Sequence, residues 1–338
     1  MLTFRVPDPG HRLAGVRLAQ EVRIPGDQVD FRRTSDGWQL KLPRPQVSRM
    51  EYLLELRHDD GSRELVTDHA NPLRVQGAFG EKSVLEFAGY RRPGWLTEPA
   101  DAGITRPFEV PARALGSAIG VLVWTPAGAA DSEQLPLLMV HDGPEYNSLA
   151  NLGKYLSAGV TAGWLPRMRA ALLAPGPRDR WYSANTRYSR ALRTVVIPAL
   201  AELVATSSRI GMGASLGALA MLHAHCRYPD CFDALFLQSG SFFVPAVDSR
   251  ERQFPYFQRV TAFVAGVHAG SLPGKPVPTT LTCGAIEENV CNNRLMTQVL
   301  QRLGYPAELH EVPDVHNYTA WRDAFDPYLT RLLQRIYP

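Results

Sequence analysis

After Pro107 the sequence alternates short apolar runs with longer stretches of helical periodicity, and this alternation limits the possible folds most strongly. Strands are predicted near residues 118–124, 137–141, 169–173, 209–212, 234–238, 279–283 and 307–312. Helices are predicted near residues 148–158, 187–205, 216–227, 292–303 and 319–336. Strands and helices that alternate along a chain are typical of a mainly parallel sheet covered by helices on both faces. The sequence therefore predicts an α/β fold for residues 108–338.

The first part of the chain has a different pattern. Residues 1–90 form short segments that alternate apolar and polar residues, such as GWQLKLP, separated by Pro-Gly, Asp-Gly and Asn-Pro turns. This pattern is typical of a small all-β sandwich. Residues 91–107 are rich in Gly and Pro and lack an apolar period, which indicates a linker between the two domains.

Composition argues against several classes of protein. The net charge is only +3 over 338 residues, and the basic residues are scattered, so we expect no nucleic-acid partner. The N-terminus lacks the features of a signal peptide, and no apolar stretch approaches the length of a membrane span, so a cytoplasmic protein is expected. Cys226, Cys231, Cys283 and Cys291 form no CxxC pair, which argues against structural zinc and a disulfide framework.

The strongest chemical motif is a serine between two glycines. Gly213, Ser215 and Gly217 follow a predicted strand and open a predicted helix. In a strand, elbow and helix arrangement, the tight turn presents the serine hydroxyl, and the glycines two residues before and after it let strand and helix pack closely. The motif predicts that Ser215 is a nucleophile.

A serine hydroxyl needs a general base, and in this arrangement the acid and then the histidine follow the serine along the chain. His316 lies on the loop between the last predicted strand and the C-terminal helix, which makes it the predicted base. The other later histidines are His223 and His225 in the helix after the serine, His268 in an irregular segment and His310 inside a strand.

The acid is expected on the loop after the preceding strand. Glu287 and Glu288 stand there side by side, and the residues alone leave both open, with Glu287 favoured. Asp314 is a weaker alternative, because an acid only two residues from His316 would need an unusual loop.

Backbone amides are expected to hold the oxyanion of the tetrahedral intermediate. The first is the amide of Leu216, directly after the nucleophile. The second is expected from HDGPEYNSL, residues 141–149. Because Pro144 has no N–H, Glu145 and Tyr146 are the alternatives, and Tyr146 is preferred.

Residues 108–337 resemble the putative esterase family of α/β-hydrolases, which includes enterochelin esterases, feruloyl esterases and mycolyltransferases. The matching pieces, in the family's order, are LLMVHDGPEYNSL, RDRWYSANTRYSRAL, GMGASLGALAML, FDALFLQSGSFF, CGAIEENVCNNRLMTQVLQRLGY and VHNYTAWRDAF. The resemblance implies the doubly wound, mainly parallel sheet of an α/β-hydrolase. It also selects Glu287, which lies three residues after Gly284, and it pairs His316 with Trp321.

The N-terminal pieces FRRTSDGWQLKLPRP, EYLLELRHDDGS and TDHANPLRV resemble the Ig-like module that precedes the hydrolase in enterochelin esterases. The resemblance therefore implies an Ig-like domain over residues 1–90, the linker 91–107 and the hydrolase domain 108–338.

One segment departs from the family's pattern. Where the family has Arg-x-x-Glu, this chain has Arg178 followed at the glutamate position by Trp181. The predicted substrate-binding residues are Arg178, Trp181, Tyr182 and Asp142, with Arg180 as a further candidate. Residues 241–266 carry several aromatic side chains and are expected to form either a lid over the substrate or a packed helical insertion.

The sequence as a whole predicts a serine hydrolase of carboxylic esters with a triad of Ser215, His316 and Glu287. The expected substrate is a small ester, siderophore-like or aromatic, and no metal or organic cofactor is implied. Two alternatives are an acyltransferase that uses the same triad and a non-catalytic, carbohydrate-associated binding protein.

Overall fold

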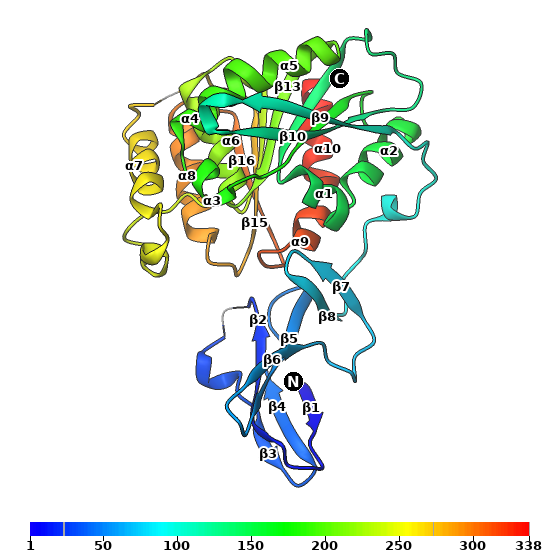
Figure 1. Cartoon of the computed structure of the whole chain (residues 1–338), viewed down its shortest axis with the longest axis vertical. Coiled ribbons are helices and arrows are strands. Elements are labelled where there is room, and N and C mark those ends of the chain that lie inside the picture. The colour runs from blue at the N-terminus through cyan, green and yellow to red at the C-terminus, as the bar shows by residue number, and fades with distance from the viewer. Residues whose placement is uncertain (23, 273, 338) are drawn as a thin grey trace. The chain divides into compact units, whose positions relative to one another are not determined.

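The computed structural model describes residues 1–22, 24–272 and 274–337 and divides into two compact units (Figure 1). The first unit contains Met1–Arg91 and two short segments from the second half of the chain, Gly284–Glu287 and Pro313–Asn317. The second unit, which we call the hydrolase unit, contains the rest of the described chain. The sequence does not predict that the two short segments belong to the first unit.

The hydrolase unit is built on an eight-stranded sheet with the order β16-β15-β14-β13-β11-β12-β10-β9. Its strands are β9 Ile104–Ala112, β10 Ser117–Thr125, β11 Leu135–His141, β12 Arg169–Leu173, β13 Thr206–Ala214, β14 Ala234–Gln238, β15 Thr279–Gly284 and β16 Ala307–Val312. Strands β12, β11, β13, β14 and β15 pair in parallel, whereas β10 is antiparallel to both β12 and β9. Strands β11, β12 and β14 are buried throughout, as expected for central strands covered on both faces.

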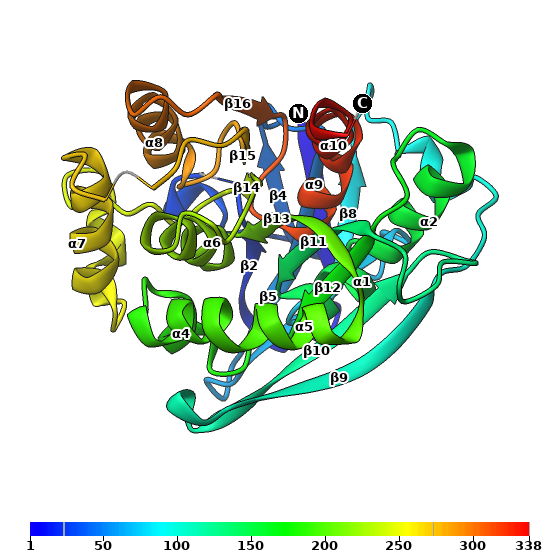
Figure 2. The ribbon, with the colours of Figure 1, turned by 90° about the horizontal axis from the view of Figure 1, so that it is seen from above.

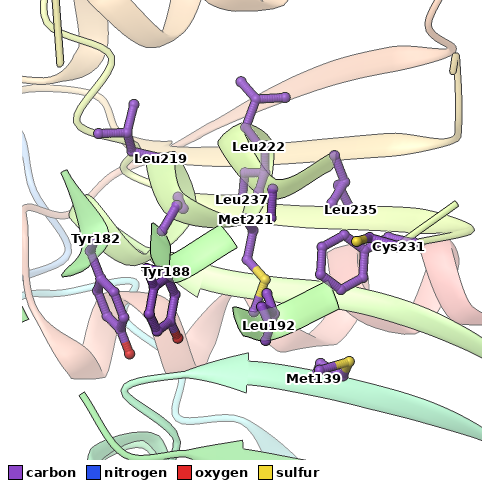
Figure 3. Close-up of a cluster of buried hydrophobic side chains, with 14 of the residues drawn as sticks. Met139, Tyr182, Tyr188, Leu192, Leu219, Met221, Leu222, Cys231, Leu235 and Leu237 are labelled. Atoms are coloured by element: carbon purple, nitrogen blue, oxygen red, sulfur yellow. The ribbon is translucent and has the colours of Figure 1, made fainter. Parts of the chain in front are cut away.

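The main helices are α1 Gly143–Leu149, α2 Leu152–Ala162, α3 Arg178–Tyr182, α4 Thr186–Ala191, α5 Ile197–Leu203, α6 Leu216–Arg227, α7 Phe257–His268, α8 Val290–Arg302, α9 Tyr318–Asp323 and α10 Thr330–Ile336. Figure 2 shows α1, α2, α9 and α10 over one face of the sheet and α4 to α8 over the other. Alternate residues of β11 enter the two cores: Met139 packs with the α4 to α8 side, part of which Figure 3 shows, and Val140 with the opposite side. The predicted doubly wound α/β-hydrolase fold is confirmed.

Strand β9 lies partly in the stretch predicted to be a linker. Its sequence, ITRPFEVPA, contains Pro107 and Pro111, which lack an N–H and argue against a central strand. In the structure β9 is an edge strand that pairs only with β10, where such prolines are tolerated. Within the same stretch Trp95 is buried against Tyr155 and Phe325.

The first unit is all-β, as predicted for the N-terminal region. One sheet has the order β1-β4-β3, and the other has the order β2-β5-β8-β7 with β6 paired to β5. The strands are β1 Leu2–Pro7, β2 Leu13–Gln20, β3 Arg32–Thr34, β4 Gly37–Leu42, β5 Arg49–His58, β6 Arg63–Val66, β7 Arg74–Gly77 and β8 Gly80–Glu86. Phe4 and Leu40 from the first sheet share one core with Val16 and Met50 from the second. The Ig-like topology stays a prediction.

In the part of the chain that the structure describes, no helix combines the length and the apolarity needed to cross a membrane.

The strand order of the hydrolase unit has a switch point beside β11. The chain leaves β11 for its neighbour β12 on one side and then crosses to β13 on the other side. In open α/β sheets, ligands bind outside the carboxyl ends of the strands at such a point. Asp142 directly follows β11 and Ser215 directly follows β13, so the predicted nucleophile stands where this rule places a site.

Candidate active site

Ser215 occupies a strained turn between β13 and α6. Its backbone angles are φ 57° and ψ −125°, a conformation that costs a non-glycine residue about 1–3 kcal/mol. Backbone hydrogen bonds hold the turn: the Ser215 N–H donates to the carbonyl of Gln238 at 2.9 Å, and the Ser215 carbonyl accepts the amide of Ser241 at 3.1 Å. The serine is half-buried while Leu216 beside it is buried, so the turn presents the hydroxyl.

The two flanking glycines are explained by close contacts. A Cβ on Gly213 would lie 2.6 Å from the carbonyl carbon of Gly217, which leaves no room for a side chain. A Cβ on Gly217 would lie 3.2 Å from the Cβ of His141 and 3.3 Å from Oδ2 of Asp142. The Gly-x-Ser-x-Gly spacing is therefore a steric requirement of this strand, turn and helix.

His141, the last residue of β11, supports the first turn of α6. Its Nδ1–H donates to the Gly217 carbonyl at 2.9 Å, and its Nε2 accepts the Tyr188 hydroxyl at 2.9 Å. Tyr182 lies beside Tyr188, with ring centroids 5.5 Å apart (Figure 3). Complete burial lowers the pKa of His141 to about 4, so the imidazole is neutral and serves as a structural link between β11 and the elbow.

This buried imidazole predicts a pH dependence of stability. The pKa of His141 is about 4 when folded and near 6.5 when unfolded, so the unfolded chain binds more protons between these values. Its contribution to the free energy of unfolding is constant above pH 6.5 and falls by about 3 kcal/mol as the pH drops to 4. Urea unfolding at pH 7 and pH 5 should show a smaller pH effect for His141→Gln than for wild type. Equal pH effects in the two proteins would contradict this assignment.

Two polar residues that contact the elbow, Ser241 and Gln238, were not predicted from the sequence. The Oγ atoms of Ser241 and Ser215 are 3.1 Å apart. The buried Gln238 side chain accepts the Tyr146 hydroxyl at 2.8 Å and donates to the carbonyl of Trp321 at 3.0 Å. A glutamine that ends the otherwise apolar strand ALFLQ was the available signal, because a buried polar side chain needs partners.

The turn that carries Ser241 is itself held by side chains from α8 and α9. The Asn293 amide accepts the Gly240 N–H at 3.0 Å and donates to the Gly240 carbonyl at 2.8 Å. The Trp321 indole N–H donates to Oγ of Ser239 at 3.0 Å. These bonds fix the turn next to the predicted nucleophile.

The predicted oxyanion donors differ in their availability. Leu216 is the first residue of α6, and the first amides of a helix have no partner inside the helix. The Tyr146 amide, in contrast, donates to the Asp142 carbonyl at 2.9 Å, so it has no proton to offer, and the prediction for Tyr146 is wrong. Because α1 starts at Gly143, the amides of Gly143 and Glu145 in its first turn replace it as candidates.

Arg178 and Asp142 form a two-pronged ion pair beside the elbow. The Arg178 Nε and Nη2 donate to the two carboxylate oxygens of Asp142 at 2.9 and 2.8 Å. Asp142 is buried, whereas the Arg178 side chain is 34% exposed and can meet a substrate. Trp181 and Tyr182 are buried in the core, and their contact with a substrate stays a prediction.

Glu287 and His316 lie together in the first unit. Oε1 of Glu287 is 3.4 Å from Nδ1 of His316, and Oε2 accepts the Gly284 amide at 3.2 Å. Glu287 is 1% exposed, whereas Glu288 is exposed to solvent. The Asp314 carboxylate accepts the amide of Val315 at 2.9 Å. The structure thus brings His316 together with Glu287 rather than Glu288, while Ser215 belongs to the hydrolase unit.

The family model for the putative esterases matches residues 112–332, well over half of the chain. The chain belongs to the putative esterase family. As a member of this family it is a carboxylic ester hydrolase. No curated protein matches the sequence.

Solved structures share the fold of this esterase. Enterobactin esterase from Shigella flexneri, solved in the presence of 2,3-di-hydroxy-N-benzoyl-glycine, has a TM-score of 0.79 and 18% identity, and the match covers 99% of this chain and 93% of that one. Ferric enterobactin esterase from Salmonella typhimurium has a TM-score of 0.80 and 19% identity, with coverage of 99% and 93%. A ferulic acid esterase has a TM-score of 0.56 and 15% identity, with coverage of 69% and 99%. At these identities the likeness is one of fold.

The aromatic stretch 241–266 of the esterase packs against the hydrolase core. Phe242 and Phe243 are buried, and Phe243 stacks on Phe257 of α7 with ring centroids 6.0 Å apart. The Arg259 guanidinium on α7 donates to the carbonyl of Arg180 at 2.7 Å. For these side chains the structure favours the packed insertion over the lid.

Proposed function

We propose that this esterase uses Ser215 as its nucleophile, His316 as general base and acid, and Glu287 to orient the imidazole. The observation that carries the proposal is the Ser215 elbow, with its strained backbone and two close-packed glycines at the switch point of the sheet. The 3.4 Å contact between Glu287 and His316 and the chain order of serine, acid and histidine support it.

In the proposed reaction, the Ser215 oxygen attacks the ester carbonyl carbon while His316 accepts the hydroxyl proton. The carbonyl oxygen becomes an oxyanion, which the Leu216 amide and a first-turn amide of α1 stabilise. His316 then gives its proton to the leaving alkoxide, which departs as the alcohol. Water, deprotonated by the same imidazole, releases the carboxylic acid from the acyl-enzyme and restores Ser215.

We further propose that the substrate carries an anionic or phenolic group. The Arg178 guanidinium is held close to the elbow by Asp142, and its Nη1 has no protein acceptor among the described residues. A guanidinium fixed in this way suits a carboxylate or catecholate oxygen. The solved esterases with the same fold were studied with enterobactin and dihydroxybenzoyl compounds, so a catecholate ester of the siderophore type is the proposed class.

Two assays test this function. The first measures hydrolysis of p-nitrophenyl esters from acetate to octanoate, with and without an added alcohol as competing acceptor. The second measures the cleavage of enterobactin by chromatography of the acid products. We expect hydrolysis in the first assay and a larger kcat/KM in the second. Ester formation that outpaces hydrolysis would favour the acyltransferase, and lack of turnover together with lack of fluorophosphonate labelling would favour a binding protein.

A further inference from the structure

We infer that the core of the all-β region, residues 1–91, holds the acid and histidine pair in position and so sets the direction of the His316 imidazole. The inference rests on the proposed function, because it assigns His316 and Glu287 their catalytic roles. It gives the all-β region a part in catalysis beyond any contact with a substrate.

The first observation is packing. Val315, the residue before His316, is 2% exposed and belongs to the core of the all-β region, together with Val16, Phe31 and Met50. Ile286, the residue before Glu287, packs against the same core. The apolar neighbour of each catalytic residue is therefore anchored among the strands of residues 1–91.

The second observation is a main-chain hydrogen bond. The Ser48 amide donates to the carbonyl of Pro313 at 2.6 Å. Ser48 directly precedes β5, and its own carbonyl accepts the Phe87 amide at 3.0 Å, so it is tied to the sheet on which the loop rests. The histidine loop has only the five residues of Pro313–Asn317 between β16 and α9, so anchoring Pro313 and Val315 limits where His316 can point.

The third observation is the close approach of the two catalytic segments. A Cβ on Gly284 would lie 2.4 Å from the Asp314 carbonyl oxygen and 2.9 Å from Oε2 of Glu287. The acid turn and the histidine loop are thus pressed together at Gly284. Ile286 and Val315 anchor these two segments on the same core, so the contacts made by these two residues hold the pair in place.

The all-β region also brings charge to the pair. Glu21, which precedes the core residue Val22, acts electrostatically on His316. Lys82 holds the Glu21 carboxylate, with Nζ 2.6 Å from Oε1.

A matched pair of valine substitutions tests the inference. Val315→Ala and Val16→Ala remove the same two methyl groups from the same core at the same 2% exposure, but only Val315 underlies the histidine loop. We expect Val315→Ala to lower kcat about tenfold with KM unchanged, and Val16→Ala to stay within about twofold of wild type, because small displacements of a catalytic group are costly. The low-field proton resonance of His316 Nδ1–H should shift or broaden in Val315→Ala alone.

The outcomes separate this inference from the proposed function. A wild-type kcat and resonance in folded Val315→Ala, or an equal loss of kcat in Val16→Ala, would overturn it. Val315→Ile crowds the same position and should also lower kcat. This variant replaces Val315→Ala in the test if Val315→Ala does not fold. If His316→Ala retains turnover, the proposed function itself fails. If His316→Ala is inactive while both Val315 variants keep a wild-type kcat, only the positioning role is wrong.

Discussion

Ser215→Ala is expected to lower kcat for ester hydrolysis by about 10⁵- to 10⁶-fold while the protein stays folded. Losing the nucleophile removes the acyl-enzyme route and leaves only binding and oxyanion stabilisation. Stability should not fall greatly, because the change removes one hydroxyl from a half-buried side chain and keeps the backbone bonds of the elbow. Steady-state kinetics on p-nitrophenyl butyrate, with circular dichroism as the folding check, measures the effect.

Ser241→Ala is the matched control for that substitution. The two hydroxyl oxygens are 3.1 Å apart, so both variants remove a hydroxyl from the same small volume, but only Ser215 stands at the strained elbow. We expect Ser241→Ala to change kcat by no more than about tenfold, the effect of losing one hydrogen bond to the nucleophile. A larger loss of kcat in Ser241→Ala than in Ser215→Ala would contradict the assignment of Ser215 as the nucleophile.

Glu287→Gln is expected to lower kcat by about 10⁴-fold with little change in KM. The amide keeps the shape of the side chain but cannot stabilise the imidazolium, and it favours the wrong histidine tautomer. The change keeps an acceptor for the Gly284 amide, which lies 3.2 Å from Oε2, so the acid turn should stay intact. The measurement is kcat and KM at pH 7 to 8 for wild type and variant.

Glu288→Gln provides the control for Glu287. The two residues are adjacent, and each substitution removes one negative charge. Glu287 is buried against His316, whereas Glu288 is exposed. Glu288→Gln should keep kcat within about twofold of wild type, as is usual for a surface substitution. Retention of more than a tenth of the activity by Glu287→Gln would remove this residue from the triad.

The parts of the fold predicted from sequence are those set by local pattern. Strands β12 and β14 have the same bounds as predicted, because short, fully buried apolar runs have few alternatives in a parallel sheet. The turn at Ser215 was predicted because its glycine spacing is a local steric requirement.

The errors at the site arise from contacts that local pattern does not encode. The first predicted helix began near residue 148, but α1 starts at Gly143. The Tyr146 amide therefore donates to the Asp142 carbonyl within the first turn of the helix. The burial of Trp181 and Tyr182 was not predicted either, because large aromatic residues suit both a pocket and a core, and the sequence alone does not distinguish the two.

The sequence also did not predict which segments of the chain make up the first unit. Val315 lies in a short loop of the hydrolase sequence, and nothing in its neighbours indicates that it is buried in a core formed by residues far away in the chain. Such long-range contacts depend on the assembled fold. In this protein they connect the all-β region to the loop that carries the predicted base, His316.

The central claim is that Ser215 is the nucleophile, and covalent labelling tests it most directly. The full-length protein is treated with a fluorophosphonate, and the modified residue is located by mass spectrometry of its peptides, with Ser215→Ala treated in parallel. We predict one adduct per chain, located on Ser215, and none in the variant. An adduct on another residue, or equal labelling of Ser215→Ala, would contradict the account.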